Sequence, residues 1–511
     1  MIIAMLVMLV TSLLLVAAFT AANGDTQLSH ADLTQKQAYY AALAGVQEYE
    51  YKLEANPDYW ETCPEPKGNV PNEASESYEV AMLAASSAPS TENTCSEAKP
   101  PANPFKTLIE SKGALANTFR IKSIGKSGTS KRSLIATFQV AGFLDYTYFT
   151  QYEDRDPQSH NGTTEEEEKC THYRKQRAAL GALNKCGTIY FGSEDSANGP
   201  MHTDDTAVVC GGVEFGRKTR LEKKEPDAVE MNGGGELGGC GSGEPIYNTT
   251  SGEPEKNGPE LVAPESDGSL KAYIEPGYEL SGLTYLELKG SENKIKVWKV
   301  ESGVKVEKTP LKWPKNGLIY IKDGASGCAY TEFEQENTDT TTTYKKEENC
   351  GSVYIKGTYS SSLTIAAEKD IIINGNIEET GVTPPAPPSG TTTLGLIATR
   401  FVRVYHPCSG GNNGSGAAGS YMENPWIYAA ILSTSHSFLV DNYTCGNGMG
   451  NLNVYGAIAQ KFRGIVGILG GSGYDKEYIY DERLATDEPP YFLAPLKAGW
   501  RIERETAPES G

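Results

Sequence analysis

The sequence predicts a mainly β protein that begins with one long α-helix. Its first residues are almost entirely apolar and continue into a helix-forming segment that ends before Pro57. From residue 187 onwards, short β-branched runs alternate with glycine and asparagine turns, and within residues 353–376 they recur at the roughly 8- to 10-residue spacing that stacked rungs produce. We therefore expect a stalk helix, a small antiparallel sheet and a parallel β-helix head, with a β-sandwich as the alternative for the head.

The N-terminal stretch, residues 2–22, contains only Thr11, Ser12 and Thr20 as polar residues, and no charged side chain occurs before Asp25. About 20 apolar residues, at 1.5 Å of helix rise each, match the hydrocarbon thickness of a bilayer. Three interpretations stay open: a cleaved secretory peptide, a single-pass membrane anchor, and a helix that later packs against neighbouring copies. The small residues near the end of the stretch favour the first, whereas the missing basic segment argues against it.

The second half of the predicted helix, residues 25–55, is amphipathic. Its apolar residues recur at spacings of three and four, which places them on one face. We predict that this face is the surface through which the stalks of neighbouring subunits bury one another. On this hypothesis Val46→Asp leaves a folded head that no longer enters the assembly. The predicted assembly stripe consists of Ala38, Ala41, Ala42, Gly45, Val46, Tyr49 and Leu53.

The β part divides into a small domain and a head. Residues 117–139 alternate apolar and polar side chains on either side of a Gly/Ser turn, which predicts a β-hairpin. The change to short β runs at residue 187 marks the start of the head. The predicted organisation is a helix at 1–56, a small β domain at 57–186, a head at 187–502 with inserted loops at 217–264 and 381–390, and a tail at 503–511.

The charge and the cysteines indicate the environment. The formal net charge is −20, which argues against a nucleic-acid partner and against an anionic membrane surface. Ten cysteines without a CxxC motif, beside six histidines, favour disulfides in an oxidising, extracytoplasmic compartment over a zinc site. Paired in order, each disulfide closes a loop of about 15–40 residues and contributes roughly 3–4 kcal/mol, although the sequence leaves other pairings open. The candidate pairs are Cys63–Cys95, Cys170–Cys186, Cys210–Cys240, Cys328–Cys350 and Cys408–Cys445.

One His/carboxylate cluster stands out, formed by His202, Asp204 and Asp205. A metal or acid–base role needs a third converging group, and the sequence offers none. We therefore expect His202 and Asp204 to hydrogen-bond the turn of a rung. No catalytic residue, cofactor-binding residue or metal ligand is predicted anywhere in the chain.

Four short stretches resemble PilX-like minor pilins, which are type IV pilus-associated proteins, here of actinobacterial type. Residues 34–47 are similar to the QAFYAAEAGV helix segment of that family, and residues 142–157 to its FLDYxYFTxYExxDP segment. Residues 198–212 resemble its GPxHTND…CG motif, and residues 473–502 its closing segment.

The resemblance implies a non-enzymatic protein of the cell surface, a minor pilin or pseudopilin that contributes to pilus assembly, adhesion or surface display. It implies other pilins as partners through the N-terminal helix, a transmembrane location before assembly and a head outside the cell, with no cofactor. A surface glycan is a further expected partner of the head. The alternatives are a membrane-anchored or secreted β-helix enzyme acting on polysaccharide and a glycan-binding adhesin.

Overall fold

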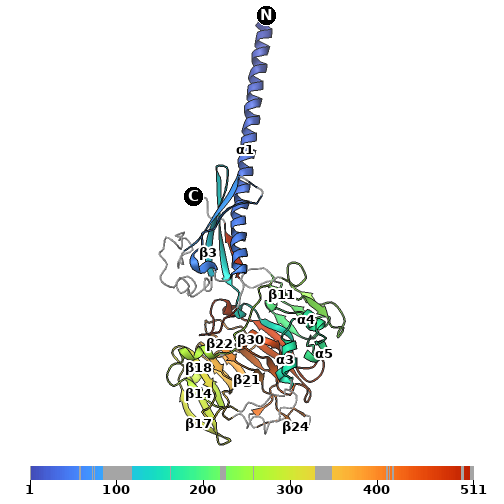
Figure 1. The fold of residues 1–511 in the computed structure, drawn as a ribbon, viewed down its shortest axis with the longest axis vertical. Helices are drawn as coiled ribbons and strands as arrows, with labels where there is room; N and C mark the ends of the chain where they lie inside the picture. The colour runs from blue at the N-terminus through green and yellow to red at the C-terminus, as the bar shows by residue number, and fades with distance from the viewer. Residues whose placement is uncertain are drawn as a thin grey trace. The chain divides into compact units, whose positions relative to one another are not determined.

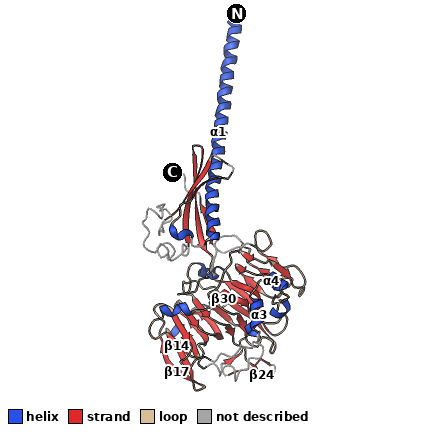
Figure 2. Ribbon diagram, in the orientation of Figure 1, coloured by secondary structure: helices blue, strands red, loops and turns tan. Residues whose placement is uncertain are grey.

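The computed structural model shows a β-rich chain with one long helix and several sheets (Figures 1 and 2). It divides into two compact units, Met1–Ala141 with Gly499–Gly511, and Gly142–Ala498. The residues it describes are 2–56, 59–71, 73, 75–83, 118–160, 163–218, 226–256, 258–328, 348–409, 412–413, 415–416, 419–496 and 500–506.

The first unit packs helix α1 (Ile2–Ala55) against an antiparallel sheet. The predicted hairpin is confirmed: β3 and β4 pair from Thr118↔Gln139 to Ser127↔Ser130, with Gly128 in the turn at a φ of +57°. The sheet order is β1 (Lys67–Asn69), β2 (Glu76–Met82), β3 (Thr118–Ser127), β4 (Ser130–Val140) and β32 (Trp500–Thr506).

The helix approaches this sheet closely because small residues face each other at the contact. The hydroxyl of Ser123 donates to the carbonyl oxygen of Ala42 at 2.7 Å. A Cβ atom on Gly125 would overlap the carbonyl oxygen of Ala38 and the amide nitrogen of Ala42. Aromatic rings fill the space beyond these small residues, namely Tyr49, Trp60, Phe119 and Phe138.

The second unit is built from parallel ladders, in contrast to the antiparallel pairing of a β-sandwich. The longest ladder joins β14 (Glu279–Ser281), β18 (Leu318–Lys322), β20 (Leu363–Ala367), β22 (Leu394–Ala398), β28 (Trp426–Ser433), β30 (Gly448–Arg463), β5 (Tyr148–Arg155), β8 (Met201–Thr203) and β11 (Val229–Met231).

Three shorter parallel ladders complete the unit. One joins β15 (Thr284–Lys289), β19 (Val353–Tyr359), β21 (Ile371–Glu379), β23 (Val402–Val404) and β29 (Phe438–Val440). Another joins β30, β31 (Gly473–Tyr480), β7 (Ser196–Asn198), β10 (Glu214–Phe215) and β13 (Ile246–Tyr247). The last joins β6 (Tyr190–Phe191), β9 (Ala207–Val209) and β12 (Gly235–Leu237).

Several antiparallel strand pairs and short helices lie outside these parallel ladders. The antiparallel hairpin β16 (Lys294–Glu301) and β17 (Val304–Leu311) extends β15. The short pairs β24 (Cys408–Ser409) with β25 (Asn412–Asn413), and β26 (Ser415–Gly416) with β27 (Gly419–Ser420), lie between β23 and β28 in the sequence. Three short helices follow β5: α3 (Thr164–Cys170), α4 (Arg174–Ala179) and α5 (Leu183–Cys186).

The core is a stack of side chains that follows the ladder register. Each member lies directly opposite the next on the neighbouring strand, and all are buried. The core stack runs Ile319, Ile365, Leu396, Ile431, Ile458, Tyr148, Met201 and Val229.

The order of strands in the ladder differs from their order in the chain. The first strand of this unit, β5, pairs with the late strand β30, and the chain continues from β5 to β8 and β11 at one end of the ladder. It then resumes with β14 at the opposite end and returns strand by strand to β30. The chain therefore enters the ladder in its middle.

These pairings change the domain boundaries expected from the sequence. The small β domain was expected to end at residue 186, but β5 belongs to the second unit because it pairs with β30 and β8. Residues 217–264 were expected to be an inserted loop, yet they contribute β11, β12 and β13 to the ladders. The expected tail begins inside β32, which pairs with β4 of the first unit.

We predict that Gly125→Ala destabilises the first unit by about 1–3 kcal/mol, because its methyl group collides with helix backbone that cannot move aside. Chemical unfolding followed at 222 nm measures the effect, since α1 dominates the helical signal. Gly142→Ala, at the first residue of the second unit, is the control, because a Cβ there meets only an Asp145 oxygen at 4.0 Å. Equal stability of the two variants would contradict the close helix–sheet contact.

Candidate functional site

The residues predicted to mediate assembly are buried within the chain itself. Ala38, Ala41, Ala42, Val46 and Tyr49 have no exposed surface, Leu53 is 1% exposed, and Gly45 is buried beside Ser123. Ala42, Val46, Tyr49 and Leu53 form the core of the first unit with side chains from β2, β3 and β4. The stripe is therefore not a free surface for neighbouring helices, and Val46→Asp would damage the first unit before it affected assembly.

The opposite face of α1 carries large side chains that are exposed. Leu33 is 53% exposed, Tyr40 is 63% exposed and Tyr51 is 69% exposed. Toward the N-terminus, where α1 extends beyond the sheet (Figure 1), the described apolar side chains are exposed as well. These are Ile3, Met5, Leu6, Met8, Leu9, Val10, Leu13, Leu14, Leu15 and Val16.

We call Leu33, Tyr40 and Tyr51 together with these N-terminal side chains the outer face of α1.

Across the described part of the chain, no helix carries an apolar stretch long enough to span a membrane.

His202 lies in a buried network in the second unit. The ring contacts Asp204 through Nε2 at 2.9 Å and Glu230 through Nδ1 at 2.7 Å, while Tyr146 donates its hydroxyl to Glu230 at 2.8 Å. The ring of Phe149 stacks on His202. Glu230 is the third group that the sequence did not reveal, because only the pairing of β8 with β11 brings it opposite His202.

This network holds a positive charge on His202. Burial alone lowers the pKa of His202, but the hydrogen bonds to Asp204 and Glu230 outweigh burial and raise the pKa from 6.5 to about 9. The ring has no exposed surface, so at neutral pH it is an imidazolium that joins the two carboxylates. The expected turn contact between His202 and Asp204 is present, and the network as a whole connects β8 to β11.

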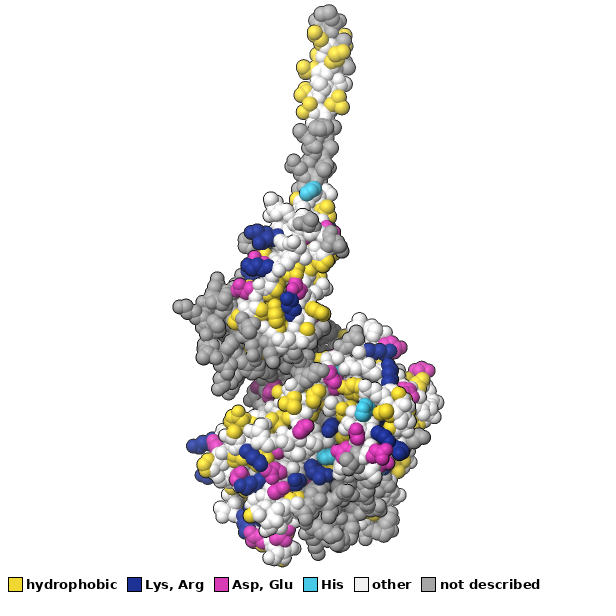
Figure 3. Space-filling view, viewed as in Figure 1, with side chains coloured by type: hydrophobic (Ala, Val, Ile, Leu, Met, Phe, Trp, Pro, Cys, Tyr) yellow, Lys and Arg dark blue, Asp and Glu magenta, His cyan; other side chains and the backbone are white. Residues whose placement is uncertain are grey.

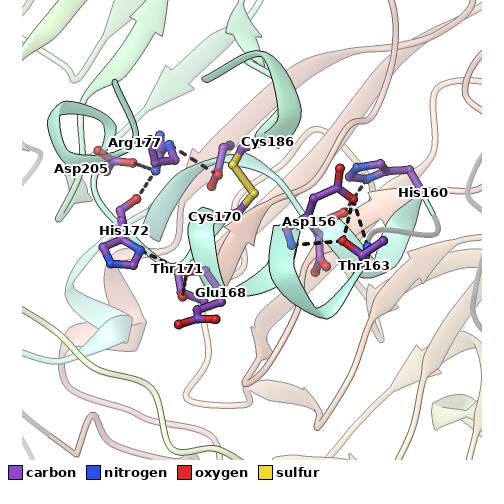
Figure 4. Close-up of a disulfide and its surroundings, with 12 residues drawn as sticks. Asp156, His160, Thr163, Glu168, Cys170, Thr171, His172, Arg177, Cys186 and Asp205 are labelled. Carbon is purple, nitrogen blue, oxygen red and sulfur yellow. Dashed lines mark hydrogen bonds and ion pairs between the residues drawn. A yellow bond between two sulfur atoms is a disulfide. The ribbon is translucent and has the colours of Figure 1, made fainter. Parts of the chain in front are cut away.

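Asp205 belongs to a different arrangement, beside a disulfide. Its carboxylate pairs with Arg177 of α4 at 2.8 Å and accepts the backbone N–H of Arg174 at 2.6 Å. Arg177 also donates to the carbonyl of His172, as Figure 4 shows, and lies 3.5 Å from Asp154. Within the second unit, the buried Arg177 thus ties the segment from α3 to α5 to Asp205, which follows β8, and to Asp154 of β5.

The disulfides follow the order of the sequence. Asp154 lies within 4.8 Å of the sulfurs of Cys170 and Cys186, but these sulfurs are bonded to each other and offer no thiolate to a metal. Of the remaining predicted pair, Cys63–Cys95, Cys63 is disulfide-bonded and Cys95 lies outside the described residues. The structure forms Cys170–Cys186, Cys210–Cys240, Cys328–Cys350 and Cys408–Cys445.

Comparison with known proteins finds similar chains among the solved structures. No protein-family model and no curated protein sequence matches the chain. Among solved structures, the crystal structure of the competence-associated pilin ComZ from Thermus thermophilus matches with 11% identity and a TM-score of 0.29, covering 93% of this chain and 98% of that one. At this identity and TM-score the similarity carries no argument, and the proposals below depend on the contacts within this chain.

We predict that the second unit loses stability as the pH rises from about 6.5 to about 9. The folded state keeps the proton on His202 across this range while an unfolded histidine releases it, so the stabilisation is complete below pH 6.5 and disappears above pH 9. The pKa difference corresponds to about 3 kcal/mol. Urea unfolding across this range, followed by near-ultraviolet circular dichroism, measures the slope.

His202→Gln is the matched variant, since it keeps a hydrogen-bonding side chain but cannot titrate. The variant is expected to be less stable and to show a flatter dependence on pH. An unchanged slope in His202→Gln would assign the pH dependence to other groups.

Proposed function

We propose that the chain is a non-catalytic subunit of a cell-surface filament, a PilX-like minor pilin of a type IV pilus. In this proposal α1 packs among the helices of other pilins through its outer face, after an earlier stage in the membrane. The second unit is a parallel β-helix head displayed outside the cell. The head then contributes to adhesion or surface display.

The observation that carries the proposal is the division of α1 into two faces. One face is already used, because the sheet of the first unit covers it. The other face keeps large apolar and aromatic side chains in water, including Leu33, Tyr40 and Tyr51. A helix that exposes such residues along its length gains free energy when neighbouring helices bury them.

The disulfides support a location outside the cytoplasm. Four bonds in the second unit persist only in an oxidising compartment, which a surface filament occupies. They also restrict the unfolded chain of a head that must remain folded without chaperones.

We predict that Tyr40→Asp reduces entry into filaments at least tenfold while the first unit stays folded. The new charge lies on an exposed helix position, so it costs little in folding but opposes burial between neighbouring helices. A tenfold change corresponds to about 1.4 kcal/mol. The measurement compares the amount of chain in sheared filaments with the amount left in the membrane fraction of the host.

Thr129→Asp is the matched control, because it adds the same charge at the exposed β3–β4 turn of the same unit. This control is expected to enter filaments normally. The proposal fails if Tyr40→Asp enters filaments as well as the control does, or if the chain is absent from sheared filaments altogether.

A further inference from the structure

A basic region interrupts this acidic chain at the β-hairpin of the second unit. Between Thr284 and Lys322 the sequence has nine lysines and four acidic residues, whereas the whole chain has a net charge of −20. Figure 3 shows Lys and Arg side chains, with Asp and Glu among them, over the part of the second unit where Figure 1 labels β14, β17 and β18. A concentration of positive charge in a protein of the opposite sign needs a physical explanation.

The strand register places several of these lysines on one face. Glu287 of β15 lies opposite Lys296 of β16 on one side and opposite Lys356 of β19 on the other. Lys289 contacts the same carboxylate at 2.8 Å. Burial alone raises the pKa of Glu287, but Lys289, Lys356 and Lys296 together hold it below its usual value. One carboxylate therefore faces three ammonium groups, of which Lys289 is the one at ion-pair distance, and the face keeps an excess of positive charge.

Aromatic rings lie in the neighbouring row of the same face. Tyr285 is directly opposite Trp298 and also opposite Tyr354, on which it stacks with ring centres 4.4 Å apart. Lys305 of β17 lies over Tyr285 and Trp298, with its Nζ 4.0 Å from the centre of the Tyr285 ring and 4.8 Å from that of Trp298. The rings lie in one row because the sheet holds their strands at a fixed spacing. Tyr354 is buried, and we call the partly exposed Tyr285 and Trp298 the aromatic platform.

The ammonium groups of Lys296, Lys305 and Lys356, beside this platform, are available to a ligand. Within the described ranges, no carboxylate lies within ion-pair distance of Lys296, Lys305 or Lys356, and Lys305 and Lys356 are exposed. Lys305 interacts with ring faces instead, and such a cation–π contact at an exposed site is worth only about 0.5–1 kcal/mol. A ligand that supplies carboxylates and an apolar ring face can replace this contact at little cost.

We propose that Lys296, Lys305 and Lys356, with the rings of Tyr285 and Trp298, form a binding site for an acidic polysaccharide. A sugar ring lies on the aromatic platform, and its carboxylate and that of the next residue pair with the lysines. This proposal does not depend on filament assembly.

The observations favour an acidic glycan over a nucleic acid. Nucleic-acid binding draws most of its affinity from many phosphate contacts along a densely charged backbone. The proposed site offers three lysines that have no ion-pair partner among the described residues, and a net charge of −20 repels a dense polyanion. A glycan with one carboxylate per sugar needs fewer cations and uses the ring faces as well.

The test measures binding of a size-defined oligogalacturonate to the full chain by isothermal titration calorimetry. A neutral malto-oligosaccharide of the same length and a duplex DNA serve as comparison ligands. We expect binding of the oligogalacturonate, weaker binding at high salt, and no detectable binding of the neutral sugar. The triple variant Lys296→Gln, Lys305→Gln, Lys356→Gln should lower the affinity at least tenfold without changing the unfolding midpoint, because these side chains are not in the core.

The matched control is the triple variant Lys169→Gln, Lys175→Gln, Lys185→Gln, which removes the same charge from the segment between α3 and α5. It should bind like the unmodified chain. Trp298→Phe keeps an aromatic face and should bind, whereas Trp298→Ala should bind several-fold more weakly. Equal losses in both triple variants, equal affinity for the neutral sugar, or tighter binding of the DNA through the same lysines would each overturn the proposal.

Discussion

The structure depends above all on the register of the parallel ladders in the second unit. Every member of the core stack lies directly opposite the next, so a shift by one residue in any strand would move its core side chain to the outer surface. Burial of Ile, Leu, Val and aromatic side chains favours this register at each step, at roughly 25 cal/mol per Å² of apolar surface. The register also decides which polar groups meet on the outer surface.

Two arrangements on the outer surface follow from this register. Phe149, His202 and Glu230 occupy successive strands in one row, and their side chains form a buried charged network where other segments cover the row. Trp298, Tyr285 and Tyr354 occupy successive strands in another row, in which Tyr354 is buried and Trp298 and Tyr285 are partly exposed. The ladder register thus determines both the buried network around His202 and the candidate binding surface around Trp298 and Tyr285.

The sequence was most informative where partners are close along the chain. The β3–β4 hairpin, the contact of His202 with Asp204 and the four observed disulfides all join residues within about 40 positions, so local pattern and order identify them. Pairs that depend on the ladder could not be predicted this way. Ile458 opposite Tyr148 joins strands from opposite ends of the unit, and nothing near either residue indicates the other.

For the amphipathic half of α1, the sequence identifies the buried face but does not show which surface covers it. Periodicity in the sequence correctly identifies Ala42, Val46 and Tyr49 as one buried face, but periodicity does not tell which surface covers that face. The chain's own sheet covers it, because the small residues at Gly125 and Ser123 leave room for the helix backbone.

This occupied face has a consequence for assembly. Alongside the sheet, a neighbouring helix can contact only the side of α1 that the sheet leaves open, which is the side that carries Tyr40 and Tyr51. Substitutions in the buried stripe therefore test the folding of the first unit, whereas substitutions on the outer face test association between subunits. A surface for partners is best sought among the large side chains that folding leaves in water, rather than among those that show the strongest periodicity.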